Sequence, residues 1–225
     1  MTQKHYRHLI TLVALLICLW GVLMIRGSSP WYGLQDAPRI WVPAGVRNYD
    51  IYGLDQTGLM VIRNAGPTTA ENFEYYAHHP PLIIWLPAIT SQFFGQNELA
   101  VRYGFIVVTL LGATMLYALT KRLYGSNVAL WTLIFYGFVP MIAYYGRVPS
   151  HDLIGVLVIL VFAYVMLDWL RDPTRSRTLV LIGLAWIAAW TAWTAVFFVG
   201  CLGLLAMWLG DKRHRLIVIG LGLVS

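Results

Sequence analysis

Charged side chains that could take part in catalysis lie in a polar stretch before residue 97, at Arg102 shortly after it, and in a short segment around residue 150. A carboxylate can remove a proton from a hydroxyl group. Arginine and histidine donate hydrogen bonds to anions, and arginine binds phosphate oxygens with two parallel bonds. The acidic candidates are Asp55 and Asp152, and the basic candidates are Arg63, His79, Arg102, Arg147 and His151. Together they suit a reaction at an anionic, phosphate-bearing substrate.

Each candidate also has a purely structural interpretation. Asp55 lies in a polar stretch, where aspartate often caps a turn, and Asp50 competes with it for a catalytic role. Asp152 follows Ser150 at an expected helix start, where the helix dipole favours an acid. Arg102 and Arg147 flank apolar runs and could extend their charged ends towards a membrane surface.

Metal binding is not favoured. His78 and His79 are adjacent, a poor spacing for sharing one metal ion, and no further ligand cluster accompanies them. The only cysteines, Cys18 and Cys201, both lie within apolar runs. We therefore expect no metal site, no disulfide and no firmly assigned cofactor, although a divalent cation remains an open alternative.

The composition indicates what must position these residues. Hydrophobic residues make up 59% of the 225 residues and charged residues only 12%, with a mean hydropathy of +0.65. Soluble domains are about 25% charged. The net charge of +6 comes from short basic clusters between apolar runs. This pattern indicates a membrane protein with the bilayer as its partner, and argues against nucleic acid as a partner.

Run lengths predict an all-α, polytopic bundle of transmembrane helices. About 20 apolar residues cross a bilayer as a helix. The stretch 179–209 is too long for one helix, so we divide it near Trp193 and Thr194. The expected spans are 9–25, 99–119, 128–145, 153–170, 179–193 and 195–209, with a long loop at 26–97.

Basic residues orient this arrangement. With the N-terminus inside, ten of the 16 Lys and Arg residues fall in inside segments and six in outside segments. Positive charge favours the cytoplasmic side. We therefore expect a multi-pass plasma membrane protein with a cytoplasmic N-terminus and the loop 26–97 outside.

The outer loop is expected to hold short helices. Residues 55–64 could form one of them. Pro80 and Pro81 suit the first turn of a second helix, over 82–94, because proline is tolerated there. Thirteen residues are too few for a clean span, so this helix should lie along the outer membrane surface.

Several motifs in and after this loop resemble the first part of GT-C glycosyltransferases, in the group of the dolichyl-phosphate-mannose protein mannosyltransferases and aminoarabinose transferases. The resemblance extends to about Asp172. It is carried by Tyr52-Gly53-Leu54-Asp55, Ile62-Arg63-Asn64, Tyr75-Tyr76-Ala77-His78-His79-Pro80-Pro81-Leu82, Phe94-Gly95, Glu98 with Arg102, Leu116-Tyr117, Lys121-Arg122-Leu123-Tyr124-Gly125 and 140–152.

The resemblance implies transfer of a sugar from a polyprenyl-phosphate donor to an unknown acceptor outside the membrane. It places a catalytic loop aspartate at Asp55 and a second acidic position at Asp152. The chemistry needs a base for the acceptor and cations or amides for the departing phosphate. Arg63, His79, Arg102, Arg147 and His151 are the candidates for phosphate binding.

Two other classes of protein remain as alternatives: a membrane transporter subunit and a non-catalytic membrane scaffold. Transporters place ionisable residues at the middle of the membrane. Here the charges gather in one loop and at the ends of spans, which favours an enzyme with a site at the membrane surface. The sequence ends at Val224-Ser225 within an apolar run, so we expect a truncated chain carrying the N-terminal part of a GT-C domain.

Overall fold

The computed structural model describes residues 3–31 and 41–210. Within these ranges the protein is built from helices, and strand pairing is limited to one antiparallel bridge between Ile62 and Tyr75. The predicted all-α helix bundle is confirmed. The elements are α1 (Gln3–Met24), α2 (Trp41–Thr57), η2 (Ala70–Asn72), α3 (Leu82–Phe94), α4 (Glu98–Tyr124), α5 (Ser126–Phe138), α6 (Pro140–Tyr145), α7 (His151–Arg171), α8 (Arg175–Ala189) and α9 (Trp193–Leu209).

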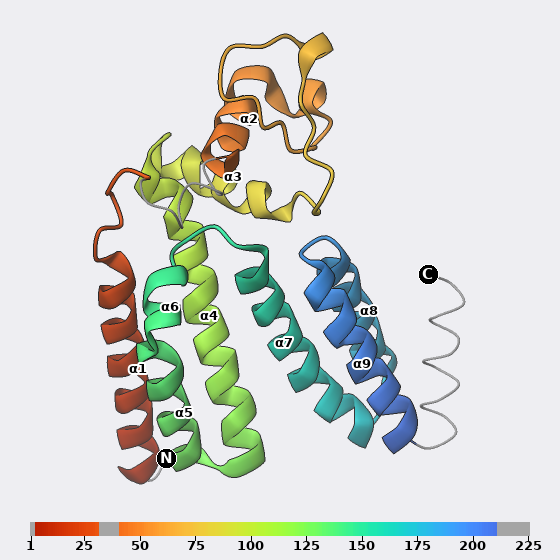
Figure 1. Ribbon diagram of the computed structural model, residues 1–225. Helices are drawn as coiled ribbons and strands as arrows, with labels where there is room; N and C mark the ends of the chain where they lie inside the picture. The colour runs from red at the N-terminus through yellow and green to blue at the C-terminus, as the bar shows by residue number, and fades with distance from the viewer. Residues whose placement is uncertain (1–2, 32–40, 211–225) are drawn as a thin grey trace.

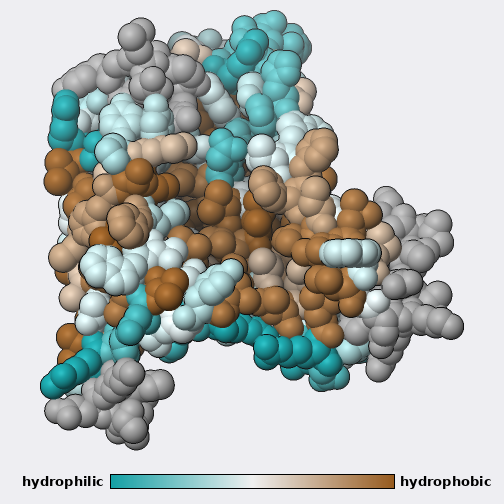
Figure 2. All heavy atoms as spheres, turned by 60° about the horizontal axis from the view of Figure 1, so that its bottom comes forward, coloured by the Kyte–Doolittle hydropathy of each residue, from teal (hydrophilic) through white to brown (hydrophobic). Residues whose placement is uncertain are grey.

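The helices form two parts (Figure 1). A bundle contains α1 and α4 to α9, and residues 41–97, here called the cap, cover one end of it. Among the residues that the structure describes, three bundle helices are long and apolar enough to cross a membrane: Tyr6–Met24, Glu98–Tyr124 and His151–Arg171. Figure 2 shows apolar side chains over the middle of the bundle and hydrophilic ones towards its ends.

Two predicted spans differ in detail from the helices observed. The stretch 128–145 is interrupted at Val139, and Pro140 begins the short helix α6. Proline has no N–H to donate and disfavours a helical residue before it, so α5 ends there. The long stretch 179–209 turns at Trp190–Ala192, a few residues before the expected division.

The helix predicted over 55–64 is wrong. The helix lies earlier, at α2, where Gly53 already departs from helical geometry with φ 73°. Gly58 and Leu59 then both adopt positive φ, which ends the helix. The loop that follows is held by α2, because the fully buried Asn48 side chain donates to the carbonyl oxygens of Ile62 and Asn64 at 2.8 and 3.1 Å.

Helix α3 has the predicted bounds and lies across the end of the bundle (Figure 1). It packs on the first turns of α4, where Leu86 lies against Gly104. Thr90 donates from Oγ1 to the Ala100 carbonyl oxygen at 2.6 Å. Its buried residues Ile83 and Ile84 join the core that unites the cap, α4 and α7. That this helix lies along the outer membrane surface stays a prediction.

The end of the bundle opposite the cap carries much of the basic charge. Arg122 of α4 and Asp168 of α7 form an ion pair there at 2.5 Å, and Arg177 of α8 pairs with Asp172 at 2.9 Å. The predicted inside residues Lys212, Arg213 and Arg215 lie outside the described residues. The side of the membrane that each end of the bundle faces stays a prediction.

Candidate active site

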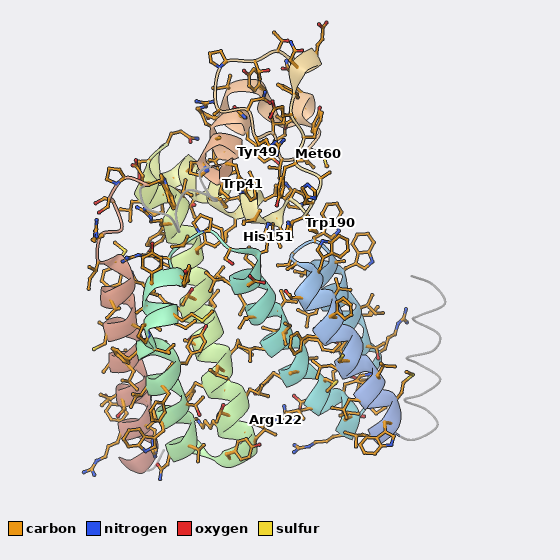
Figure 3. All side chains as sticks on the ribbon, in the orientation of Figure 1. Trp41, Tyr49, Met60, Arg122, His151 and Trp190 are labelled. Carbon is orange, nitrogen blue, oxygen red and sulfur yellow. The ribbon has the colours of Figure 1, made fainter. Side chains whose placement is uncertain are left out.

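A cavity of about 200 Å³ lies between the cap and the adjoining ends of α7 and α9. Figure 3 shows Trp41 of α2 and His151 of α7 beside each other at this junction. Three of the seven predicted site residues line it: His79, His151 and Asp152. The full lining is Trp41, His79, Ile83, Pro149, Ser150, His151, Asp152, Ala192 and Thr194.

The start of α7 positions two of these residues. Ser150 is its N-cap, and the Ser150 hydroxyl accepts a hydrogen bond from the Asp152 N–H at 3.3 Å. Serine is a preferred N-cap and an acid in the first turn is favoured by the helix dipole. Thr194 of α9 donates from Oγ1 to Asp152 Oδ1 at 3.3 Å. The Asp152 carboxylate is exposed at the cavity with one oxygen oriented by α9.

The cap places His79 at the same cavity. His79 immediately precedes Pro80 and Pro81, which lead into α3. The Tyr76 hydroxyl lies 2.8 Å from His79 Nδ1. Burial raises the pKa of Tyr76, and the positive charge of Arg63 lowers it by less. The phenol therefore stays neutral at physiological pH.

Aromatic rings connect the cap to α7. Trp41 stacks on Tyr76 with ring centroids 4.5 Å apart, and His79 stacks on His151 at 4.4 Å with 21° between the ring planes. Trp41 and His151 are 6.2 Å apart. These ring contacts join the cap to the start of α7 beside the cavity.

Tryptophan side chains hold the cap over the α8–α9 turn. Trp193 donates from Nε1 to the His78 carbonyl oxygen at 3.0 Å. Trp85 donates to the Leu59 carbonyl oxygen at 3.1 Å and stacks on Trp190, with centroids 5.4 Å apart. These contacts fix the wall of the cavity that Ala192 and Thr194 provide.

Arg102 and Arg147 lie elsewhere. They line a second cavity of about 70 Å³ together with Arg26, Ser29, Pro30, Tyr144 and Val148. Arg102 is buried, stacks over Trp31 at 3.9 Å, and donates to the carbonyl oxygens of Gly27, at 2.8 Å, and Ser29. Arg147 donates to the Ile25 carbonyl oxygen. Both guanidinium groups thus hold the segment after α1 against the bundle.

Asp55 and Arg63 do not line either cavity. Asp55 is exposed, beyond the bend at Gly53. Arg63 is exposed and its Nε lies 3.4 Å from Glu74 Oε2. The structure therefore brings His79, His151 and Asp152 together, separates Arg102 and Arg147 from them, and leaves Asp55 and Arg63 on the outer part of the cap.

Sequence reasoning gave neither Trp41 nor Tyr76 a role in the site. One signal for Tyr76 was available, its position three residues before His79 in a segment ended by prolines. No such signal existed for Trp41, because its contact with His151 joins residues far apart in the chain. Over residues 3–31 and 41–210, no group of three or more His, Cys, Asp or Glu side chains could hold a metal ion.

Comparison with known protein families decides what this arrangement belongs to. The sequence model of the dolichyl-phosphate-mannose-protein mannosyltransferase family matches residues 78–221, more than half of the chain. The chain belongs to this family. No curated protein and no solved structure gives a significant match.

Membership of the mannosyltransferase family makes the protein a membrane glycosyltransferase of the GT-C type. The resemblance found in the sequence is thereby confirmed. The matched region begins at His78, so it contains all three predicted residues that line the cap–bundle cavity. It also contains Arg102 and Arg147, whereas Asp55 and Arg63 precede it.

Proposed function

We propose that this protein transfers a sugar from a polyprenyl-phosphate donor to an acceptor at the cap end of the bundle, and that the cap–bundle cavity binds the sugar phosphate. The observation that carries the proposal is the meeting of His79 from the cap with His151 and Asp152 from α7 in one cavity. A carboxylate can act as the base of such a transfer, and an imidazole N–H can donate to the departing phosphate.

The roles follow from the chemistry of the reaction. Asp152 takes the proton of the acceptor hydroxyl while the acceptor oxygen bonds to C1 of the sugar. The bond between C1 and the phosphate oxygen breaks, and its electron pair leaves on the polyprenyl phosphate. His79 donates a hydrogen bond to that phosphate when it carries a proton on the nitrogen that faces it, and His151 holds the His79 ring by stacking on it.

We assign the role of general base to Asp152 rather than to Asp55. A general base must come within hydrogen-bond reach of the proton it removes. Asp152 lines the cavity, and Thr194 orients one of its oxygens. Asp55 is exposed on the far side of the Gly53 bend.

We further propose that the cap lies outside the cell membrane and the N-terminus in the cytoplasm. The basic clusters at the end of the bundle opposite the cap, including Lys121, Arg122 and Arg177, support this orientation. The donor's polyprenyl chain would then lie in the outer leaflet, beside the apolar surface of the bundle.

The experiment uses the full chain in lipid nanodiscs with polyprenyl-phosphate mannose, glucose and aminoarabinose. Binding is measured by native mass spectrometry and turnover by release of polyprenyl phosphate. We expect at least one donor to bind and His79→Ala to weaken that binding about tenfold, the scale for losing a hydrogen bond to a charged group. Asp55→Ala, which is exposed on the cap and lines neither cavity, is the control. Equal losses in both variants, or no binding of any donor, would count against the cavity.

A further inference from the structure

The two stacked histidines contact different kinds of partner through the same ring nitrogen. Nδ1 of His151 lies 3.1 Å from the Thr191 carbonyl oxygen. Nδ1 of His79 lies 2.8 Å from the Tyr76 hydroxyl. A neutral imidazole carries its proton on one nitrogen only, so these partners determine what each ring offers to the cavity.

His151 is fixed by a partner that can only accept. A carbonyl oxygen has no proton to donate, so the proton of this bond lies on His151 Nδ1. The lone pair of the neutral ring is therefore on Nε2. Thr191 is fully buried, and its own hydroxyl donates to the Ile187 carbonyl oxygen, so the turn that presents this carbonyl is held in place.

His79 has a partner that can donate. A phenolic O–H is a stronger acid than an imidazole N–H, so Tyr76 is the better donor of the two groups. Burial raises the pKa of Tyr76, which keeps the proton on the phenol. The stack with Trp41 holds the Tyr76 ring in position. Nδ1 of His79 then accepts, and the ring proton lies on Nε2.

We propose that Tyr76 and the Thr191 carbonyl hold the two histidines in opposite tautomers, so that His79 carries its proton on Nε2, as a donor to the cavity, and His151 carries its proton on Nδ1. Tyr76 is a positioning residue in this arrangement, acting on a ligand through His79. The inference rests on the proposed function for the identity of the ligand, a prenyl phosphate, whose oxygens would accept from His79 Nε2. The other charged group at the cavity is Asp152, whose carboxylate also accepts rather than donates.

The test is nitrogen NMR of the full chain in nanodiscs with ¹⁵N-labelled histidine, combined with calorimetric binding of farnesyl phosphate. His79→Gln and His151→Gln assign the signals. We expect protonated Nε2 on His79 and protonated Nδ1 on His151. Tyr76→Phe should leave His79 in a mixture of tautomers and weaken farnesyl phosphate binding about tenfold. Tyr75→Phe, the exposed neighbour, is the control and should change neither reading.

The farnesyl phosphate affinity of conservative variants at position 79 is a second measurement, and a purely structural role of His79 would not produce the expected difference. Gln places an amide near the position of histidine Nε2, whereas Asn places it near Nδ1. His79→Gln should therefore keep farnesyl phosphate affinity within about threefold, and His79→Asn should lose about tenfold.

The two claims fail separately. The same tautomer on both histidines, or a Tyr76→Phe protein with unchanged His79 signals, would overturn the inference. Equal affinities of the Gln and Asn variants would overturn the donor role of His79 Nε2. Absence of farnesyl phosphate binding by the wild type would refute the proposed function instead, because the tautomers are measured without ligand.

Discussion

Replacing Asp152 with asparagine removes one negative charge and little else. The side chains have nearly the same shape, and the asparagine oxygen can still accept from the Thr194 hydroxyl, now 3.3 Å from Asp152 Oδ1. The α7 cap is also preserved, because Ser150 accepts from the backbone N–H of residue 152. We therefore expect a folded protein with unchanged thermal stability.

The catalytic loss should be large. Removing a general base slows a reaction by roughly 100- to 10,000-fold. Donor affinity should stay the same or rise slightly, because the cavity loses a charge that repels phosphate. The assay follows release of polyprenyl phosphate at saturating donor and acceptor. Asp55→Asn, the control, should keep near wild-type turnover, since Asp55 is exposed away from the cavity. A folded Asp152→Asn protein with normal turnover would refute the assignment.

Three further predictions test the structure around the site. The first replaces Cys18 and Cys201 with serine and then adds single cysteines. Gly66→Cys should react with an impermeant thiol reagent added outside intact cells, whereas Tyr124→Cys should react only after the cells are permeabilised. The reverse pattern would overturn the proposed topology. Arg102→Met should lower the melting temperature by roughly 5–10 °C, because it removes charge-assisted hydrogen bonds to two carbonyl oxygens. Arg26→Met, which changes an exposed residue of the smaller cavity, should change the melting temperature little. Equal effects would contradict the role of Arg102 in holding the segment after α1. Gly104→Ala should cost about 1–3 kcal/mol of unfolding free energy, because its new Cβ would lie 2.9 Å from Leu86 Cγ. Gly112→Ala is the control, because its Cβ would lie 3.6 Å from the Tyr136 hydroxyl, an ordinary contact; equal stability of the two variants in denaturant unfolding would show that α3 does not pack on Gly104.

The fold was largely predictable because its determinants are local. Apolar runs give the bundle helices, and the prolines at 80 and 81 mark the start of α3. The exact breaks depend on single residues. Pro140 ends α5 inside one apolar run. The start of α2 carried no such local signal. This helix holds the loop that follows it through Asn48, whose hydrogen-bond partners lie about 15 residues further along the chain.

The sequence predicted which types of residue form the site better than it predicted which of them meet in one cavity. His151 and Asp152 are neighbours at one helix start, so they had to lie together. His79 reaches them only through the packing of the cap on α7, which the sequence does not specify. Arg102 and Arg147 share the chemistry of a phosphate ligand, yet their hydrogen bonds go to the carbonyls of Ile25, Gly27 and Ser29. Residue chemistry alone could not distinguish the two uses of arginine.

If the cap–bundle cavity binds the lipid-linked donor, the bound donor should protect a cysteine in the cavity wall from chemical modification. Thr194→Cys in the Cys18→Ser, Cys201→Ser background places a thiol in the wall of the cavity, and Gly66→Cys places one on the exposed cap. Modification by a water-soluble thiol reagent is timed with and without the polyprenyl-phosphate sugar that the protein binds. With donor at about ten times its Kd, we expect modification at position 194 to slow about tenfold and modification at position 66 to stay unchanged. Equal rates at position 194 with and without saturating donor would contradict this expectation.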